Sequence, residues 1–285
     1  MRIFARGWSN GFDGPGRRLV YYLKGCNLRC LWCGNPESIA AAPEMLFYPE
    51  KGAFAAESCP HGAVDDGRLD RAICARCEDH ACVERWRDPA FERVGEQISV
   101  GQIVEQVEAR RPFFGKDGGV TFSGGEPTLQ MDALLEAADA LRGRGVHVAI
   151  ETNASSPRFR ELAGRFDLLL CDLKAVSADL HARMTGADNR VILANLASGI
   201  RMTVRVPLIR ELNFAPEERE EIHRFLVQAR PERVGLLLLH RLGLPKYRAL
   251  GITFEGDDLT PPDRDDVEAF RLALERDGLA AEILN

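Results

Sequence analysis

Three cysteines lie close together near the start of the chain. The stretch "GCNLRCLWCGNP" (residues 25–36) places Cys26, Cys30 and Cys33 in the spacing C-x3-C-x2-C. Three thiolates in one loop can hold three corners of an iron–sulfur cube, and the fourth iron then lacks a protein ligand and can bind another molecule. A structural zinc site would normally add a fourth cysteine or histidine, and no histidine lies near this loop. A redox dithiol and a chance group of core thiols are the remaining alternatives.

A second group of cysteines follows in residues 37–98. Its members are Cys59, Cys74, Cys77 and Cys82. This segment is rich in proline and glycine and shows no clear strand–helix pair, so we expect a small inserted domain that is organised by metal and not by a large core. Since the N-terminus lacks an apolar signal sequence, the cysteines indicate metal or redox chemistry more than a disulfide framework.

Two charged residues end a predicted buried strand. In "CDLK" (171–174), Asp172 and Lys174 are two residues apart, so both side chains point to one face of the strand, whereas Cys171 points to the other. Two charges inside a parallel barrel are unfavourable unless they pair with each other or bind a charged ligand. Cys171, alone on this strand, is expected to be a core residue.

Other polar residues follow the ends of neighbouring predicted strands. They are Gly124, Gly125 and Glu126 of "SGGEP", Glu151 and Thr152 of "ETN", Arg205 of "VRVPL" and His240 of "LLLLH". Because barrel enzymes bind ligands where the carboxyl ends of parallel strands meet, we expect these residues to surround one site. The bland alternatives are a tight β–α turn for the glycines and an ordinary surface position for the histidine.

Alternating strands and helices must position these residues. Apolar runs predict strands at 17–25, 118–125, 146–153, 167–174, 201–209 and 232–240, and helical patterns lie at 99–111, 131–145, 155–164, 177–185, 216–229 and 262–277. This order predicts a parallel sheet with right-handed crossovers. The expected fold class is therefore α/β: a partial (β/α)6 TIM-like barrel of residues 1–36 and 99–285, with residues 37–98 inserted.

Composition narrows the function classes. The formal net charge is −6, which gives no electrostatic reason to expect a nucleic-acid partner. No run approaches the roughly 18 apolar residues that a membrane helix needs, so no membrane partner is expected. Together with the absence of a signal sequence, these features predict a cytoplasmic protein.

The longer stretch "DGPGRRLVYYLKGCNLRCLWCGNPES" (13–38) resembles a known family. It is similar to the glycyl-radical-enzyme activating branch of the radical S-adenosylmethionine (SAM) superfamily, whose members include pyruvate formate-lyase activating enzymes. The resemblance continues through "GGVTFSGGEPTLQ", "ETN", "DLK", "RVPLI" and "LLLLHRLG", and so covers nearly the whole chain. Several spaced motifs in the expected order are far more specific than one.

This resemblance implies an activity. A [4Fe-4S] cluster held by Cys26, Cys30 and Cys33 would bind SAM and cleave it reductively to a 5′-deoxyadenosyl radical, which abstracts a hydrogen atom from a backbone glycine of a partner glycyl radical enzyme. The expected reductant is a flavodoxin or a ferredoxin. An alternative is radical chemistry on a small molecule or peptide, and a non-catalytic iron–sulfur electron-transfer protein is a further one, against which the strand-end residues argue.

The resemblance also implies residue roles around SAM. Gly124, Gly125 and Glu126 would bind the methionine ammonium, and Lys174 would lie near the methionine carboxylate. The remaining SAM-binding candidates are Trp32, Asn35, Thr152, Asp172, Arg205 and His240. A candidate site for a monovalent cation is formed by Glu151, Thr152 and Asp172, although relatives often carry aspartate at position 151.

The inserted segment resembles two ferredoxin motifs of the form C-x2-C-x2-C-x3-C-P that have lost part of their ligands. The first keeps only its last cysteine, since its earlier positions are Pro49, Gly52 and Ala55. The second reads "CARCEDHAC". In two-cluster ferredoxins the fourth cysteine of one motif binds the other cluster. We therefore predict one auxiliary [4Fe-4S] cluster in a ferredoxin-like insert, held by Cys59, Cys74, Cys77 and Cys82, with a zinc site of the same residues as the alternative.

One residue departs from the family pattern in the cluster loop. Gly34 stands where the family usually has histidine, in "CGNPE". Any contribution of that imidazole to the site is absent here, and this difference is compatible with a small molecule or a peptide as the target.

Overall fold

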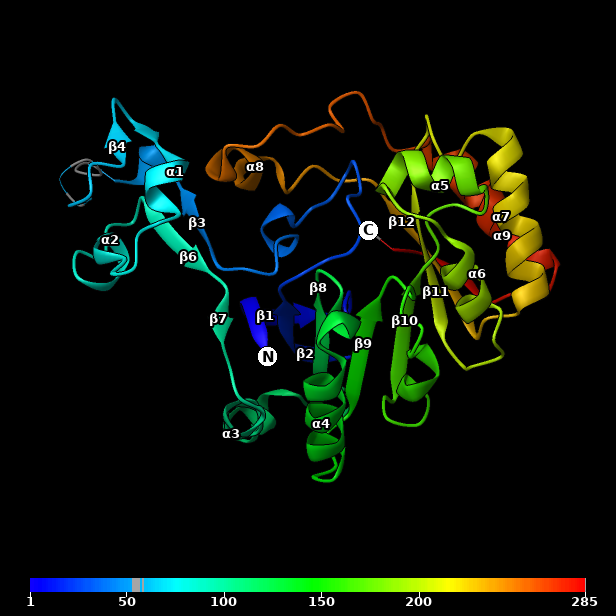
Figure 1. The fold of residues 1–285 in the computed structure, drawn as a ribbon. Coiled ribbons are helices and arrows are strands. Elements are labelled where there is room, and N and C mark those ends of the chain that lie inside the picture. The colour runs from blue at the N-terminus through cyan, green and yellow to red at the C-terminus, as the bar shows by residue number, and fades with distance from the viewer. Residues whose placement is uncertain (53–56, 58, 285) are drawn as a thin grey trace.

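A single open sheet forms the main body of the protein (Figure 1). The computed structural model describes residues 1–52, 57 and 59–284. Over these residues the sheet has nine strands in the order β13-β12-β11-β10-β9-β8-β2-β1-β7. From β2 to β13 all neighbours pair in parallel. The predicted α/β fold with a mainly parallel sheet is therefore confirmed.

All six strands predicted from the sequence are present. They are β2 (Arg17–Leu23), β8 (Gly119–Gly124), β9 (Val148–Thr152), β10 (Leu168–Asp172), β11 (Thr203–Leu208) and β12 (Arg233–Leu238). Most of their residues are buried, as near-continuous apolar runs in parallel sheets usually are. Their carboxyl ends lie at one edge of the sheet.

Three further strands extend the sheet at its two ends. β1 (Arg2–Asn10) forms an antiparallel hairpin with β2, and β7 (Glu96–Gln97) pairs with β1. β13 (Ala281–Leu284) runs parallel to β12. These strands were not predicted, because their partly exposed residues lack the apolar runs that mark the central strands.

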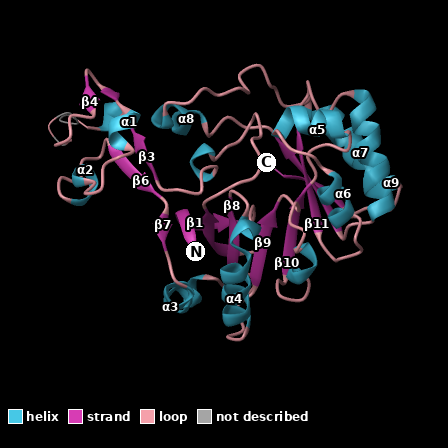
Figure 2. Cartoon of the chain, in the orientation of Figure 1, coloured by secondary structure: helices cyan, strands magenta, loops and turns pink. Residues whose placement is uncertain are grey.

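Helices cover the outside of the sheet (Figure 2). The predicted helices are α3 (Val100–Arg110), α4 (Met131–Arg142), α5 (Ala178–Thr185), α7 (Pro216–Ala229) and α9 (Arg264–Arg276). α6 (Arg190–Leu196) and α8 (Leu244–Leu250) were not predicted. The helix expected over 155–164 was wrong, since only the 3-10 turn η5 (Phe159–Leu162) forms there. The other 3-10 turns are η1 (Pro36–Ser38), η2 (Pro49–Lys51), η3 (Arg111–Phe113) and η4 (Pro127–Gln130).

One large apolar core lies between the sheet and these helices. It contains Cys171, which is fully buried, as the sequence predicted. Among the described residues no helix is both long enough and apolar enough to cross a membrane.

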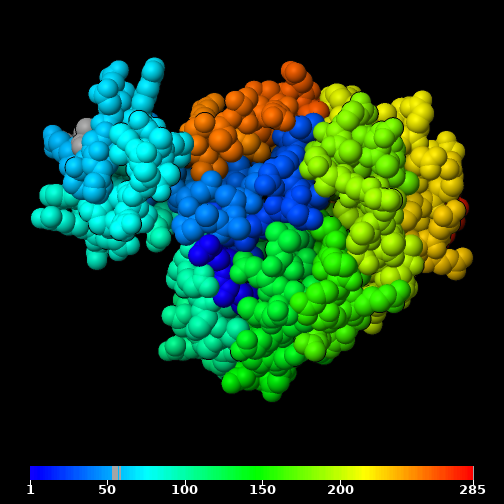
Figure 3. All heavy atoms as spheres, in the orientation of Figure 1, coloured from blue at the N-terminus to red at the C-terminus, as the bar shows by residue number. Residues whose placement is uncertain are grey.

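The described residues of 44–94 form a lobe beside the main body (Figure 3). β3 (Glu44–Phe47) pairs with β6 (Phe91–Val94), β4 (Val64–Asp65) pairs with β5 (Arg68–Leu69), and α1 (Arg71–Cys74) and α2 (Ala81–Glu84) complete the lobe. Its small core contains Met45, Phe47, Val64, Cys82, Ala90 and Phe91. The lobe therefore has some apolar packing of its own in addition to its cysteines.

Candidate functional site

The three-cysteine loop leaves the carboxyl end of β2 and is fixed by backbone hydrogen bonds. The N–H of Cys26 donates to the carbonyl of Ile39, and the N–H of Cys33 donates to the carbonyl of Cys30, both at 3.0 Å. Burial raises the pKa of Cys26 to about 11 and that of Cys30 to about 12. These thiols therefore need a metal or a nearby cation in order to ionise.

Lys174 supplies a cation to this loop. It lies just beyond β10, is nearly buried, and favours the thiolate form of Cys26, Cys30 and Cys33. Its Nζ donates to Oδ2 of Asp172 at 2.7 Å. Burial lowers the pKa of Lys174, but the carboxylate of Asp172 and the thiol of Cys30 more than offset this effect and raise it. The predicted pair of Asp172 and Lys174 thus lies beside the cysteine loop, and the ammonium of Lys174 is charged.

The glycines of "SGGEP" pack tightly against the strand that enters the cysteine loop. A Cβ at Gly124, whose φ is +118°, would lie 2.4 Å from the backbone nitrogen of Leu23. A Cβ at Gly125 would lie 2.3 Å from the carbonyl oxygen of Gly25. Both distances are far below van der Waals contact, so both positions require glycine for this packing alone, whether or not a ligand binds there.

The carboxylate of Glu126 is completely buried and bonded to the protein. Its Oε1 accepts hydrogen bonds from the N–H of Thr128 (3.0 Å), the hydroxyl of Thr128 (2.6 Å) and the hydroxyl of Thr152 (2.8 Å). Its Oε2 accepts one from the N–H of Asn153 (2.7 Å). This side chain therefore ties the turn after β8 to the end of β9. Since both carboxylate oxygens of Glu126 already accept hydrogen bonds within the protein, the backbone atoms of Gly124, Gly125 and Glu126 are left to bind the ammonium of SAM, and this binding stays a prediction.

Glu151 of β9 and Arg205 of β11 form a mostly buried ion pair across β10, the strand between them. The hydroxyl of Ser123 donates to Glu151 at 2.5 Å, and Arg205 also donates to the carbonyl of Phe12 at 3.2 Å. Burial raises the pKa of Glu151 to about 7, although Arg205 opposes that shift. Because Arg205 lies next to Asp172 in register, this pair adjoins the Asp172–Lys174 pair.

The segment after β12 covers the cysteine loop. A Cβ at Gly34 would lie 3.2 Å from Cε1 of His240. A Cβ at Gly243 would lie 2.8 Å from the carbonyl oxygen of Gly34, so the two glycine backbones are in direct contact. The predicted site residue His240 therefore borders the loop at the residue that departs from the family pattern. Trp32 packs against a small apolar cluster that includes Ala175, the residue after Lys174.

Sequence reasoning missed Lys246, which binds this loop from α8. Its Nζ donates to Oδ1 of Asn35 at 2.8 Å and to Oε1 of the buried Glu37 at 2.5 Å. Asn213, also missed, is fully buried and donates to the carbonyl of Lys174 at 2.8 Å. Each contact joins residues far apart in the chain, and no local pattern could have indicated them.

A family model described as the radical SAM superfamily matches residues 20–226. The chain belongs to the radical SAM superfamily. The 4-hydroxyphenylacetate decarboxylase activating enzyme of Clostridioides difficile is 32% identical over 290 residues, which cover 95% of this chain and 92% of that protein. The trans-4-hydroxy-L-proline dehydratase activating enzyme of the same organism is 34% identical over 288 residues, which cover 95% of each. Within the superfamily, the chain is thus of the type that activates glycyl radical enzymes.

A solved structure shows the same fold. The crystal structure of a radical SAM methyltransferase from Sphaerobacter thermophilus matches with a TM-score of 0.58 at 16% identity, over 99% of this chain and 73% of that one. Membership in the radical SAM superfamily implies a [4Fe-4S] cluster and SAM as cofactors. The donor set fits such a cluster, because three thiols from one loop face a common cation and the loop supplies no fourth ligand.

The four cysteines of the lobe also lie near one another. Burial and the charges of Cys59 and Cys77 raise the pKa of Cys74, and burial and the charges of Cys59, Cys74 and Cys77 raise the pKa of Cys82. Cys59 and Cys74 pack against the small core that contains Cys82. A Cβ at Gly52 would lie 2.6 Å from Cβ of Ala90, so this position has no room for a cysteine. Ala55, another position where the first motif lacks cysteine, lies outside the described residues.

Proposed function

We propose that this radical SAM enzyme abstracts a hydrogen atom from a backbone glycine of a partner glycyl radical enzyme, with its cluster on Cys26, Cys30 and Cys33. The observation that carries the proposal is the meeting of these three partly buried thiols with the ammonium of Lys174 at the carboxyl edge of the sheet. When bound, the cluster and SAM supply the 5′-deoxyadenosyl radical.

The side chains of this chain have distinct tasks in the proposal. Lys174 supplies a positive charge for the carboxylate of SAM, and Asn213 fixes the backbone carbonyl of Lys174. Asn35 is held by Lys246, and His240 borders the loop that contains Trp32. Such fixed groups orient SAM at the cluster and exclude water from the radical.

The monovalent cation at Glu151, Thr152 and Asp172 stays a prediction. Each of these groups already has a partner inside the protein: Arg205 for Glu151, Lys174 for Asp172, and the carboxylate of Glu126 for the hydroxyl of Thr152. A cation would therefore have to replace a present ion pair, most directly by drawing Asp172 away from Lys174.

We further propose that residues 37–98 form a ferredoxin-like domain with one auxiliary [4Fe-4S] cluster on Cys59, Cys74, Cys77 and Cys82. Zinc–sulfur bonds of about 2.3 Å would hold sulfur atoms about 3.8 Å apart. Within the described part of the chain, only one group of three metal-binding side chains has all its ligand atoms within 4.8 Å of one another, and it consists of His61, Cys77 and Asp79. No three of the four cysteine thiols form such a group among the described residues, and this spacing supports a cluster over a single zinc ion.

The partner and the reductant follow from the family and are part of the proposal. Similar relatives activate a decarboxylase and a dehydratase, at identities of 32% and 34%, so identity does not choose between such partners. A flavodoxin or a ferredoxin would supply the single electron that each cleavage of SAM consumes.

The activity is tested by anaerobic incubation of the reconstituted protein with SAM and dithionite. We expect formation of 5′-deoxyadenosine and, with the correct partner, the doublet of a glycyl radical in electron paramagnetic resonance. If the fully loaded enzyme forms no 5′-deoxyadenosine, the proposed activity is wrong. If it forms 5′-deoxyadenosine but no glycyl radical with any glycyl radical enzyme encoded nearby, the target is a different one.

The auxiliary cluster is tested by iron analysis. Two cubane clusters predict about eight irons per chain, and Cys59→Ala should reduce this number to about four. Cys171→Ala is the matched control, because Cys171 is a buried core residue, and it should keep about eight. An unchanged iron content in Cys59→Ala would refute the assignment of Cys59.

A further inference from the structure

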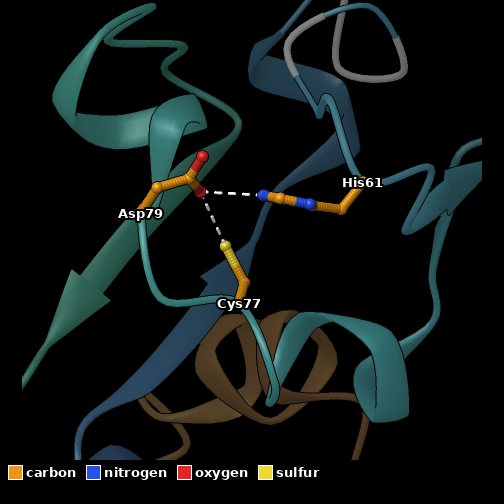
Figure 4. Close-up of side chains that lie close together, drawn as sticks. All are labelled: His61, Cys77 and Asp79. Atoms are coloured by element: carbon orange, nitrogen blue, oxygen red, sulfur yellow. Dashed lines mark hydrogen bonds and ion pairs between the residues drawn. The ribbon is translucent and has the colours of Figure 1, made fainter.

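Three metal-binding side chains meet on the surface of the lobe (Figure 4). Nε2 of His61 lies 2.8 Å from Oδ1 of Asp79, and Sγ of Cys77 donates to the same oxygen at 3.1 Å. All three ligand atoms lie within 4.8 Å of one another. His61 follows Cys59 in the chain, whereas Cys77 and Asp79 belong to the loop between α1 and α2, so two separate segments of the lobe converge here.

Cys77 differs from the other three cysteines of the lobe. Cys82 is part of the small apolar core, and Cys59 and Cys74 pack against it, but Cys77 is not among the described residues of that core. Its thiol is engaged by Asp79 at the surface instead. Of the four thiols, Cys77 is thus the one that has a second set of metal ligands beside it.

We propose that His61, Cys77 and Asp79 form a site for one divalent transition metal ion of the Zn²⁺ class, with water as the fourth ligand. Imidazole, thiolate and carboxylate are all normal zinc ligands, and three protein ligands with one water are the usual composition of an open zinc site.

The geometry fits a tetrahedral ion after a small movement. Metal–nitrogen and metal–oxygen bonds of about 2.1 Å and a metal–sulfur bond of about 2.3 Å place the nitrogen and oxygen about 3.4 Å apart, and the sulfur and oxygen about 3.6 Å apart. The present separations are 2.8 and 3.1 Å. An opening of roughly 0.5 Å by exposed side chains is therefore enough to admit the ion in place of the bridging protons.

The site would compete with the auxiliary cluster for Cys77. This consequence, but not the binding of the ion itself, rests on the cluster proposed above. A protein without clusters should hold the divalent ion, and assembly of the cluster should release it when Cys77 becomes a cluster ligand. The lobe would then exchange a mononuclear metal for an iron–sulfur centre without a change in its fold.

The test uses the full-length protein, prepared without clusters and titrated with Zn²⁺ or Co²⁺. We expect one equivalent of Zn²⁺ per chain in addition to any bound by the loop of Cys26, Cys30 and Cys33, and this equivalent should be lost in Cys77→Ala. His61→Asn should weaken it by at least the 10- to 100-fold that the loss of an outer partner of a metal ligand costs. His80→Asn is the matched control, because His80 lies on the same loop with Nδ1 directed to the carbonyl of Glu78.

The spectrum of bound Co²⁺ separates this site from a four-cysteine site. One thiolate should give about one quarter of the sulfur-to-cobalt absorption of four. If His61→Asn binds like the wild type while Cys59→Ala loses the ion, the metal uses the four cysteines and the proposal is wrong. A failure to bind this equivalent at all also refutes it.

Reconstitution keeps this proposal apart from the cluster proposal. As the iron content rises from about four to about eight per chain, the bound Zn²⁺ should appear in solution, where a chromogenic chelator detects it. In Cys59→Ala the Zn²⁺ should remain bound. An iron content that stays at about four would refute the auxiliary cluster without affecting the zinc site, and eight irons with the Zn²⁺ retained would refute the competition.

Discussion

Replacement of Glu126 by glutamine tests whether the carboxylate of the "SGGEP" turn serves the fold or the ligand. In the structure this carboxylate accepts four hydrogen bonds within the protein. Glutamine has nearly the same shape but only one acceptor oxygen. If that oxygen takes the place of Oε1, the amide nitrogen must take the place of Oε2 and face the N–H of Asn153.

The expected cost follows from that single contact. A hydrogen bond to a charged group contributes roughly 1.5–3 kcal/mol, and an unsatisfied buried donor costs roughly 1–3 kcal/mol. Burial of the charge, which raises the pKa of Glu126, offsets part of this loss. We therefore expect Glu126→Gln to lower the free energy of unfolding by about 3 kcal/mol, which corresponds to a fall in the thermal midpoint of about 5–10 °C for a chain of this size.

The assay is thermal unfolding of protein that contains neither cluster nor SAM, followed by circular dichroism. In this state no ligand is present, so a carboxylate that served only SAM would leave the midpoint unchanged. Glu105→Gln, an exposed glutamate on α3, is the matched control and should shift the midpoint by no more than about 1 °C.

A midpoint within 1 °C or so of the wild type would contradict the structural role assigned to Glu126. If the same variant then bound SAM more weakly after cluster loading, the carboxylate would be a ligand of SAM, and the hydrogen bonds within the protein would not be its main task.

Three further predictions concern charged groups at the strand ends and the cysteine loop. Burial raises the pKa of Glu151 to about 7, so between about pH 5 and pH 7 the folded protein holds a proton on Glu151 that the unfolded chain has lost. The contribution of Glu151 to the free energy of unfolding therefore falls as the pH rises through this range, and Glu151→Gln should remove that part of the pH dependence of the thermal midpoint. Lys174→Ala should weaken SAM binding about 10- to 100-fold, measured by equilibrium dialysis of the cluster-loaded protein, with iron content unchanged, and loss of iron would contradict its role. Lys246→Met leaves the buried carboxylate of Glu37 without its ammonium partner and should lower the free energy of unfolding, measured with urea, by about 3 kcal/mol. Adding Glu37→Gln to this variant should recover most of that stability, and no recovery would show that Lys246 acts otherwise.

The central sheet could be predicted because its strands carry their own signal. Each is a short apolar run ended by a glycine or a polar residue. The predicted strand ends differ from the observed ones by only one or two residues in most cases. β1, β13 and the paired strands of the lobe lack that signal. β3 and β6, for example, are formed by residues 44–47 and 91–94, whose pairing depends on the lobe being folded.

Candidate residues were easier to find than their partners. Asp172 and Lys174 could be predicted to pair, because alternation along a strand places them on one face. The contact of Lys246 with Asn35 could not, since 211 residues separate them and α8 has no strong helical pattern. Glu126 was assigned to a ligand from motif similarity alone, because its four donors become visible only when the ends of β8 and β9 are brought together.

The contact between the backbones of Gly34 and Gly243 links the identity of two distant positions. A side chain at residue 243 would collide with the backbone of residue 34, and a side chain at residue 34 would press on His240. Restoring the histidine of the family at position 34 therefore requires the ring of His240 to give way, because a Cβ at residue 34 already lies closer to that ring than an ordinary contact. Exchanges at position 34 should therefore be combined with changes at His240 while residue 243 stays glycine, which couples the segment after β12 and the cluster loop in any engineering.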